Sequence, residues 1–506
     1  ELLKQHEEAI EKLEACDKDE AFLIKSEGGH VYVIGKKPIG ALYGTYTLLE
    51  TLGVRWFHPG VLGEHVPHSA AVSLPDELNN FQKPDMVFRY QRGGTGPYDA
   101  YEVNLWAARN KMQIASTPAL RWLEVGRCTP ERARFLNEAL NARGPSRGGH
   151  MIWDQTVPDE LFAGHPEYYP LKDGERKVGG GAGGFQRCVS NPEVLQRVVR
   201  AAVEWCGADP KNQFTFDAAD SRETWCACEH CRAMGTVDGS FTIATMYHRF
   251  ASCAVKGILD RLPEARLGVM FYIDKAYPPA DKTIRYDGPN VHGIYCTCWP
   301  YARCYAHALT DPDCEPNRKC LANMLEILKV CPRLYTFEYL CNANIEYVPV
   351  WKTTTQDIKD MARAGYLGYM DIVHGYKWRA RWLSLYLGAK LQWNTSLDPD
   401  ALRADAYAGY YGAAAPAMTR YHDLRLKLWD SAPGHAFYGG PKRNAYCLTV
   451  PGAETELRAH LAEARTLAKA DPRVLERCPL DEQYLDEFWK APADILAERF
   501  SAEKQV

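Results

Sequence analysis

Two aspartates stand directly before a group of closely spaced cysteines in the segment FTFDAADSRETWCACEHCRAMG, residues 214–235. Asp217 and Asp220 follow the apolar run FTF, which is where a buried strand would end. Carboxyl groups in such a position can transfer protons during hydrolysis, and glycoside hydrolysis usually employs two of them. We expect Asp217 to hold a loop or point into the sheet wall. Asp220 is a candidate catalytic residue, with capping of the following helix as the alternative.

Glu338 lies between aromatic residues in the apolar run RLYTFEYL, residues 333–340. An unpaired charge would be costly to bury there, and an apolar site favours the protonated form of a carboxyl group, which suits a general acid. We therefore predict that Glu338 is the general acid and Asp220 its catalytic partner. The alternative is a structural Glu338 that pairs with an arginine, for which Arg92 and Arg379 are candidates.

Other polar and aromatic residues fall at or near the predicted strand ends, where they would contact sugar hydroxyls or pack against sugar faces. His150 follows two glycines, and a structural role is as open as a binding role. Trp299 would either stack on a sugar or cover the mouth of the fold. The candidate substrate-binding residues are His150, Arg92, Asn110, Tyr272, Trp299, Tyr339, Asp371 and His374.

The chain has 17 cysteines, an odd number, so at least one thiol lies outside any intrachain pairing. Three of them form a Cys-x-Cys-x2-Cys motif, and two more form a Cys-x-Cys motif near another predicted strand end. These thiols would form either a structural zinc site or disulfides between neighbouring loops. The candidate zinc ligands are Cys226, Cys228, Cys231 and Cys298.

The elements that must position these residues are short apolar segments, several of them followed by a helical stretch. Eight such segments predict a (β/α)8 TIM barrel in the α/β class, whose active site would lie at the C-terminal ends of the strands. The predicted strands cover residues 87–94, 103–112, 150–155, 212–220, 266–274, 291–299, 333–340 and 365–373. The glycine-rich stretch 178–185 is predicted to be a flexible loop that could serve as a lid.

Three domains are expected. Residues 1–82 contain a strand, VYVIG, and a helix, ALYGTYTLLETLG, and so predict a small N-terminal α/β domain. Residues 83–394 would form the barrel, and residues 395–506 a helical C-terminal domain. The formal net charge is only −4 and no apolar run is long enough to cross a bilayer. We therefore expect neither a nucleic-acid partner nor a membrane span.

Several blocks of the sequence resemble known families. GALYGTYTLLETLGVRWFHPG is similar to the small domain that precedes the barrel in α-glucuronidases and β-hexosaminidases. HPEYYPLKDGERK, QRCVSNPEV, Asp-x5-Cys-x-Cys-x2-Cys and KLQWNTSLDPDALRADAYAGYYG resemble the bacterial domain-of-unknown-function family 4838. That family includes glycoside hydrolase family 163, the endo-β-N-acetylglucosaminidases that act on N-glycans. The resemblance runs from about residue 30 to about residue 420, and it implies a protein that is secreted, periplasmic or on the cell surface.

The resemblance and the strand-end acids together predict a retaining endo-β-N-acetylglucosaminidase that uses general-acid catalysis, by a covalent or a substrate-assisted route. Its partner would be an oligosaccharide or a glycoprotein glycan, no cofactor is expected, and the sequence specifies no oligomeric state. One alternative is an exo-acting glycosidase of α-glucuronidase type, with Arg92 and Lys111 binding a carboxylate, or of β-hexosaminidase type. The others are a non-catalytic carbohydrate-binding barrel and a zinc-dependent hydrolase.

Overall fold

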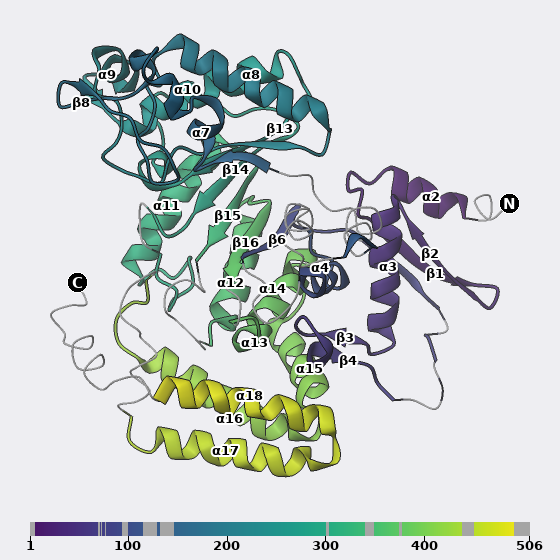
Figure 1. Cartoon of the computed structure of the whole chain (residues 1–506). Coiled ribbons are helices and arrows are strands. Elements are labelled where there is room, and N and C mark those ends of the chain that lie inside the picture. Colours follow the sequence, from purple (N-terminus) through teal and green to yellow (C-terminus); the bar gives the residue numbers. More distant parts are fainter. Residues whose placement is uncertain are drawn as a thin grey trace.

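A curved sheet of seven parallel strands forms the centre of the molecule (Figure 1). The computed structural model describes residues 6–68, 71, 73–75, 77–93, 100–114, 129–131, 146–299, 303–339, 349–373, 377–437 and 450–489. The strand order is β6-β16-β15-β14-β13-β10-β7, so the strands of this sheet from β10 to β16 lie side by side in the order in which they follow one another along the chain. The strands are β6 (Phe88–Gly93), β7 (Ser146–Gly149), β10 (Gln213–Phe216), β13 (Arg266–Phe271), β14 (Val291–Cys296), β15 (Leu334–Glu338) and β16 (Gly368–Val373).

Six of the eight predicted strands overlap strands of this sheet, and the other two predictions are wrong. The segment 103–112 belongs mainly to a helix, α4 (Ala100–Arg109), because its apolar residues recur at helical spacing and bury Trp106 and Ala107 on one face. The segment 150–155 falls on the short helix α7 (Ile152–Thr156), and the strand β7 precedes it. Within the described residues the sheet is a curled half-barrel, and an eight-stranded closure remains a prediction.

Alternating side chains divide each strand between two apolar layers. The helix-facing layer includes Phe214, Phe216 and Leu334, whereas Met270, Ile294 and Phe337 pack together on the concave inner side of the sheet. This division follows from the two-residue period of a strand, and it determines which strand-end residues can reach the mouth of the half-barrel. The larger helices of the outer layer are α8 (Pro192–Ala208), α10 (Ile243–Leu259), α11 (Glu315–Val330), α12 (Trp351–Arg363) and α14 (Trp382–Trp393).

The N-terminal part contains a three-stranded antiparallel sheet in the order β2-β1-β5, with the helix α3 beside it (Figure 1). Gly40 must be a glycine, since an added Cβ atom would lie 2.3 Å from the carbonyl oxygen of Ala21. Trp393 of α14 packs against Phe22 and Tyr43, with ring centroids 5.8 and 5.6 Å away, and so joins this part to the half-barrel. The elements are α2 (Glu7–Glu14), β1 (Phe22–Glu27), β2 (His30–Gly35), α3 (Pro38–Thr51), β3 (Arg55–Trp56), β4 (Glu64–His65) and β5 (Asn79–Gln82).

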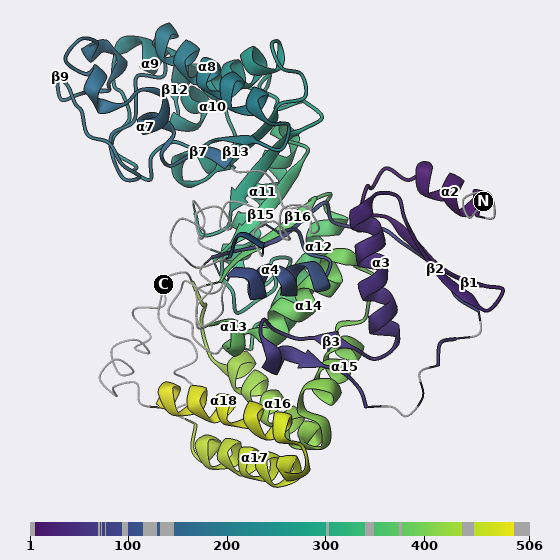
Figure 2. The same ribbon diagram turned by 45° about the vertical axis from the view of Figure 1, so that its right-hand side comes forward.

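The C-terminal part is helical, as predicted, and its long helices lie together on one side of the molecule (Figure 2). Its core includes Tyr410, Tyr411 and Leu461, but also Phe57 of the N-terminal part and Trp382 of α14. This shared core ties all three parts together, while the domain boundaries at residues 82 and 394 remain predictions. None of the helices in the described ranges has the length and apolar character needed to span a membrane. The helices are α15 (Pro399–Tyr411), α16 (Ala415–Ser431), α17 (Ala453–Leu467) and α18 (Pro472–Trp489).

Candidate active site

A buried ion pair connects the C-terminal ends of three neighbouring strands. Asp217 directly follows β10 and is 1% exposed. The Nζ atom of Lys275 donates to Oδ1 of Asp217 at 2.8 Å, and Nδ1 of His150 lies 3.0 Å from Oδ2. His150 follows β7 and Lys275 follows β13, so the Asp217 carboxylate holds both loops. His150 is thereby placed beside the mouth, by which we mean the end of the half-barrel where the C-terminal ends of the strands lie. Its side chain is only partly buried.

The turn after β13 has an unusual backbone. It is the short 3-10 turn η5 (Ile273–Ala276), and Ile273 has φ of +53°, a conformation that a β-branched residue rarely adopts. The Nε2 atom of His248 lies 2.7 Å from the carbonyl oxygen of Lys275 and helps to hold the turn. Backbone of this kind costs energy and is concentrated at functional sites. It places Tyr272 and Asp274 on either side of the strained residue.

Asp220 is exposed, and hydrogen bonds to the preceding segment fix the loop that carries it. The backbone N–H of Asp220 donates to the carbonyl of Ala182, which belongs to the glycine-rich stretch 178–185. The side chain of Gln186 donates to the carbonyl of Ala219 at 2.9 Å and accepts from its N–H at 3.0 Å. The glycine-rich stretch, predicted as a flexible loop, therefore supports the Asp220 loop through defined contacts.

Tyr272 lies between His150 and Asp220 at the inner end of β13. Its ring centroid is 5.7 Å from that of His150. Burial, together with the nearby Cys298 and Asp220, raises the pKa of the Tyr272 phenol. Tyr272 therefore remains a hydrogen-bond donor at neutral pH, directed at a site that contains a carboxylate.

Asp274 and Trp299 both lie close to Arg222, in the loops that follow β13 and β14. Burial raises the pKa of the Asp274 carboxyl, and the Arg222 charge opposes that rise. The Arg222 guanidinium lies 3.9 Å from the centre of the Trp299 ring, and Trp299 is 36% exposed. An exposed indole beside charged groups can pack against the CH face of a sugar while the charges bind its hydroxyls. Sequence reasoning overlooked Asp274 although it follows a strand, as Asp220 does.

Glu338 lies on the other side of the sheet. Tyr335 and Phe337 of β15 belong to the inner cluster, so the alternation directs Glu338 to the helix-facing layer. Its side chain is completely buried, and its Oε2 atom accepts hydrogen bonds from Thr297 at 2.6 Å and Arg303 at 2.8 Å. This placement does not fit the predicted role of general acid, because a buried carboxyl on this face cannot reach a glycosidic oxygen. The structural alternative fits, with Arg303 rather than Arg92 or Arg379 as the partner.

Asp371 belongs to the same buried network and does not lie at the mouth, contrary to the substrate-binding prediction. It is the register partner of Glu338 on β16, and its carboxylate pairs with Arg381 at 2.9 Å. Arg303 also pairs with Asp357 of α12. Burial raises the pKa of Asp371 to about 6, with the Arg381 charge opposing the rise and the Glu338 charge adding to it.

We expect the stabilisation associated with Asp371 to decrease as the pH rises from about 4 to about 6. The folded-state pKa of about 6 lies above the ordinary value of 3.8, so the folded protein keeps a proton that the unfolded chain releases. The stabilisation is complete below the unfolded-state pKa of 3.8 and is lost as the pH rises through the folded-state pKa of about 6. Urea unfolding of the wild type and of Asp371→Asn between pH 4 and 7 measures this slope. An identical slope in the two proteins would contradict the assignment.

Asn110 is likewise not a binding residue. It is completely buried at the end of α4, where its Nδ2 atom donates to the carbonyls of Trp106 and Trp56, each at 3.0 Å. The prediction was wrong because it rested on a strand where the chain forms a helix. The neighbouring Lys111 donates to Glu50 at 2.9 Å, beside the N-terminal part, and so does not lie at the mouth.

Tyr339 lies at the same end of the sheet, whereas Arg92 and His374 are described only in part or not at all. Tyr339 follows β15 on the inner side, partly buried, with its ring centroid 4.6 Å from that of Phe337. The backbone of Arg92 lies in β6 beside β16, but its side chain is outside the described part of the structure, as is the whole of His374. Of the predicted residues, the half-barrel thus brings Asp220, His150, Tyr272, Trp299 and Tyr339 to one end.

The cysteine motif has a different fourth partner from the one predicted. Cys188 joins Cys226, Cys228 and Cys231, and the four sulfur atoms lie within 4.8 Å of one another. Cys298 instead lies in the inner cluster of the sheet. Cys188 precedes Cys228 by 40 residues, and only the folding of α8 and β10 between them brings the two together. The sequence therefore gave no reason to prefer it.

The sulfur separations fit a zinc site better than disulfides. Cys188 Sγ lies 3.7 Å from that of Cys228 and 3.8 Å from that of Cys231. Sulfur atoms at about 2.3 Å from a tetrahedral zinc are about 3.8 Å apart, whereas a disulfide requires about 2.05 Å. All the cysteines in the described ranges have free thiols. The cluster anchors the loop after β10, which carries Asp220.

We expect Cys188→Ser to lose about one equivalent of zinc and to unfold at a lower temperature than the wild type, because a closed zinc site contributes directly to folding. Cys298→Ser is the matched control, since both thiols are buried but only Cys188 belongs to the cluster. Zinc content and melting temperature should be measured on both. Loss of zinc from Cys298→Ser alone would restore the original prediction.

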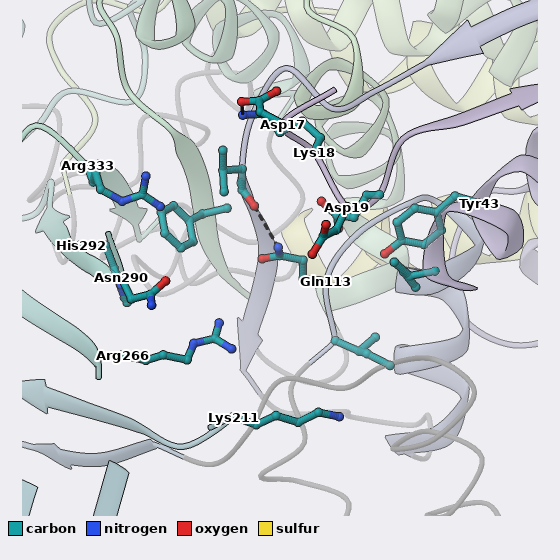
Figure 3. A pocket seen from close by; sticks show the side chains of 15 residues that line it. Asp17, Lys18, Asp19, Tyr43, Gln113, Lys211, Arg266, Asn290, His292 and Arg333 are labelled. Carbon is teal, nitrogen blue, oxygen red and sulfur yellow. Dashed lines mark hydrogen bonds and ion pairs between the residues drawn. The ribbon is translucent and has the colours of Figure 1, made fainter. Parts of the chain in front are cut away.

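A cavity of about 530 Å³ lies at the opposite end of the strands, between the sheet and the N-terminal part. Figure 3 shows Lys211, Arg266 and Arg333, at the beginnings of strands, opposite Asp17 and Asp19. In half-barrel and barrel folds the chemistry occurs at the C-terminal ends of the strands. This cavity is therefore part of a junction between two units of the fold rather than the candidate active site.

The fold is similar to that of known glycoside hydrolases. A GH138 enzyme targeting pectin rhamnogalacturonan II aligns with a TM-score of 0.50 and 10% identity, over 93% of this chain and 63% of its own length. A family 89 glycoside hydrolase from Clostridium perfringens, in complex with PUGNAc, aligns with a TM-score of 0.51 and 10% identity, over 92% and 58%. This chain thus spans about three fifths of each of these proteins, and such low identity shows the fold alone.

No curated protein is similar enough in sequence to match this chain. The family described as "Domain of unknown function (DUF4838)" does match, over residues 58–423. The matched region includes the seven-stranded sheet, the Asp217 ion pair, the cysteine cluster and the first C-terminal helix. It covers most of the chain, in agreement with the sequence blocks that resembled this family. The protein therefore belongs to the DUF4838 family.

Proposed function

We propose that the protein is a glycoside hydrolase whose active site lies at the C-terminal end of the sheet, on a scaffold of (β/α)8 type. The main support is the placement of two carboxyl groups at this end: Asp220 lies close to Tyr272, and Asp274 lies close to Arg222, whose guanidinium lies over the Trp299 ring. Two acids of different environment next to a sugar-binding surface are what glycoside hydrolysis requires. The similarity of the fold to GH138 and GH89 proteins adds to this support.

The environments of the two acids suggest separate roles. Asp274 is partly buried, and burial raises its pKa, so it is the better general acid and would protonate the glycosidic oxygen as the bond breaks. Asp220 is exposed and would act as the negatively charged partner. It would either attack the anomeric carbon or bind the acetamide N–H of a substrate whose acetamide oxygen attacks instead. Either route retains the anomeric configuration and needs no cofactor.

The proposed substrate is a β-linked N-acetylhexosamine within an N-glycan. The proposal rests on the blocks that resemble family 163 enzymes and on the binding of PUGNAc by the structurally similar family 89 protein. The exo-acting α-glucuronidase alternative is weakened because Lys111 is paired with Glu50 away from the mouth. A non-catalytic sugar-binding barrel would not need a second, partly buried acid such as Asp274.

The test is incubation of the protein with a glycoprotein that carries complex N-glycans, followed by mass spectrometry of the products. Release of a glycan with one N-acetylglucosamine left on the protein supports endo action on this substrate. Parallel assays with aryl β-N-acetylglucosaminides and aryl α-glucuronides distinguish the exo-acting alternatives. Absence of hydrolysis of all these substrates, with PUGNAc bound, would favour a binding protein. Absence of both hydrolysis and PUGNAc binding would overturn the substrate proposal.

A further inference from the structure

A second group of metal-binding side chains lies beside the C-terminal helices, outside the candidate active site. Cys304, His307 and Cys314 belong to the segment between β14 and α11, and His435 follows α16. One ligand atom from each of the four residues lies within 4.8 Å of every other. Nothing in the proposed hydrolysis uses these residues.

The separations fit tetrahedral zinc. The Sγ atom of Cys304 lies 3.3 Å from Nδ1 of His307, and the Sγ atom of Cys314 lies 3.7 Å from Nδ1 of His435. Sulfur at about 2.3 Å and nitrogen at about 2.0–2.1 Å from a tetrahedral zinc are about 3.6 Å apart. Two thiolates and two imidazoles form a ligand set that zinc commonly occupies in structural sites.

The surroundings suit such a site. Cys304 is completely buried and Cys314 is 2% exposed. The backbone N–H of Ala436, the residue after His435, donates to the Cys304 sulfur at 3.4 Å, and such a donor stabilises a thiolate. The ring planes of the two histidines are inclined by 82°, with centroids 5.5 Å apart, so that both rings can direct a nitrogen to one point.

A buried asparagine holds the loop in the shape that brings three of the ligands together. Asn317, in the first turn of α11, donates to the carbonyls of Cys304, His307 and Ala308 at 2.9–3.0 Å. Its Oδ1 atom accepts from the N–H of Cys304 at 2.8 Å. Such supporting contacts orient the ligands before a metal binds and are a regular part of metal sites.

We propose that Cys304, His307, Cys314 and His435 bind a zinc ion that fastens the loop after β14 to the C-terminal helical part. All four coordination positions come from the protein, so the site is closed and structural rather than catalytic. The ion would link residues 121 positions apart in the chain. Cys304 is the neighbour of Arg303, so the same ion would steady the loop from which Arg303 holds Glu338 and Asp357.

The test is the zinc content of the protein purified without added metal, measured by inductively coupled plasma mass spectrometry. His435→Ala and Cys314→Ser should each contain about one equivalent less than the wild type. His230→Ala is the matched control, because His230 is exposed and adjacent to Cys231 but belongs to neither ligand group. Equal zinc contents in the wild type and His435→Ala would overturn the proposal.

A measurement on the wild type covers the case in which these variants do not fold. X-ray absorption at the zinc edge should show histidine nitrogen as well as sulfur in the first shell, since the Cys188 cluster supplies sulfur only. A shell of sulfur alone, or a Cys304–Cys314 disulfide in peptide maps, would overturn the proposal. Neither readout depends on hydrolysis, so the result is independent of the proposed activity.

Discussion

Replacing Arg303 by methionine should lower the free energy of unfolding by about 3–5 kcal/mol, the usual cost of leaving buried charges without their partner. The Arg303 guanidinium is completely buried and pairs with two carboxylates, Glu338 and Asp357. Methionine keeps much of the side-chain volume, so the loss would be mainly electrostatic. Burial raises the pKa of Asp357 to about 6 even with the arginine present, which indicates how unfavourable this environment is for a negative charge.

Urea unfolding of Arg303→Met at pH 7 provides the measurement. Arg261→Met is the matched control, because Arg261 is exposed and its guanidinium donates to the carbonyl of Gly257 at the surface. The double variant Arg303→Met/Glu338→Gln should recover part of the loss, since one of the two stranded charges is then removed. A loss below about 1 kcal/mol for Arg303→Met, similar to that of a surface pair, would contradict the structural role of the network.

Replacing Asp274 by asparagine should reduce kcat by about 10²–10⁴-fold on substrates with a sugar leaving group, the range expected for the loss of a general acid. The reduction should be much smaller on an aryl glycoside with an acidic phenol, because that leaving group departs without protonation. The basis is the position of Asp274 in the strained turn after β13 and the rise in its pKa through burial.

The comparison between the two leaving groups separates chemistry from misfolding. A misfolded or displaced active site would lose both activities together. Loss of the general acid alone would reduce mainly the activity on the substrate with the sugar leaving group, which needs protonation. Asp281→Asn is a suitable control, since Asp281 pairs with Arg249 outside the site. Equal losses on both substrates, in a protein that melts like the wild type, would exclude Asp274 as the general acid.

Much of the sheet was predictable, because strands buried on both faces appear as apolar runs followed by helical patterns. The same property explains the misplacement of Glu338. Both faces of β15 are apolar, so the run RLYTFEYL does not indicate which face is the inner one. Only the packing of Tyr335 and Phe337 in the inner cluster decides it, and this packing is a property of the whole sheet.

Other parts of the site depend on contacts between distant segments. The pairing of Asp217 with both His150 and Lys275 joins three loops, and no local pattern indicates it. Asp274 is different, since the rule that selected Asp220 after one strand would also have selected Asp274 after the next. Asn110 shows the opposite error, in which a helical segment was taken for a strand and its capping residue for a ligand of the substrate.

The most direct test of the account compares Asp220→Asn with Glu338→Gln on one substrate that the wild type hydrolyses, with both proteins shown to be folded. We expect a reduction in kcat of about 10²-fold or more for Asp220→Asn, at the mouth, since asparagine can neither attack nor carry the charge. We expect folded Glu338→Gln to remain active, because the Glu338 side chain is buried on the helix-facing side. Loss of activity in Glu338→Gln, with Asp220→Asn fully active, would contradict it.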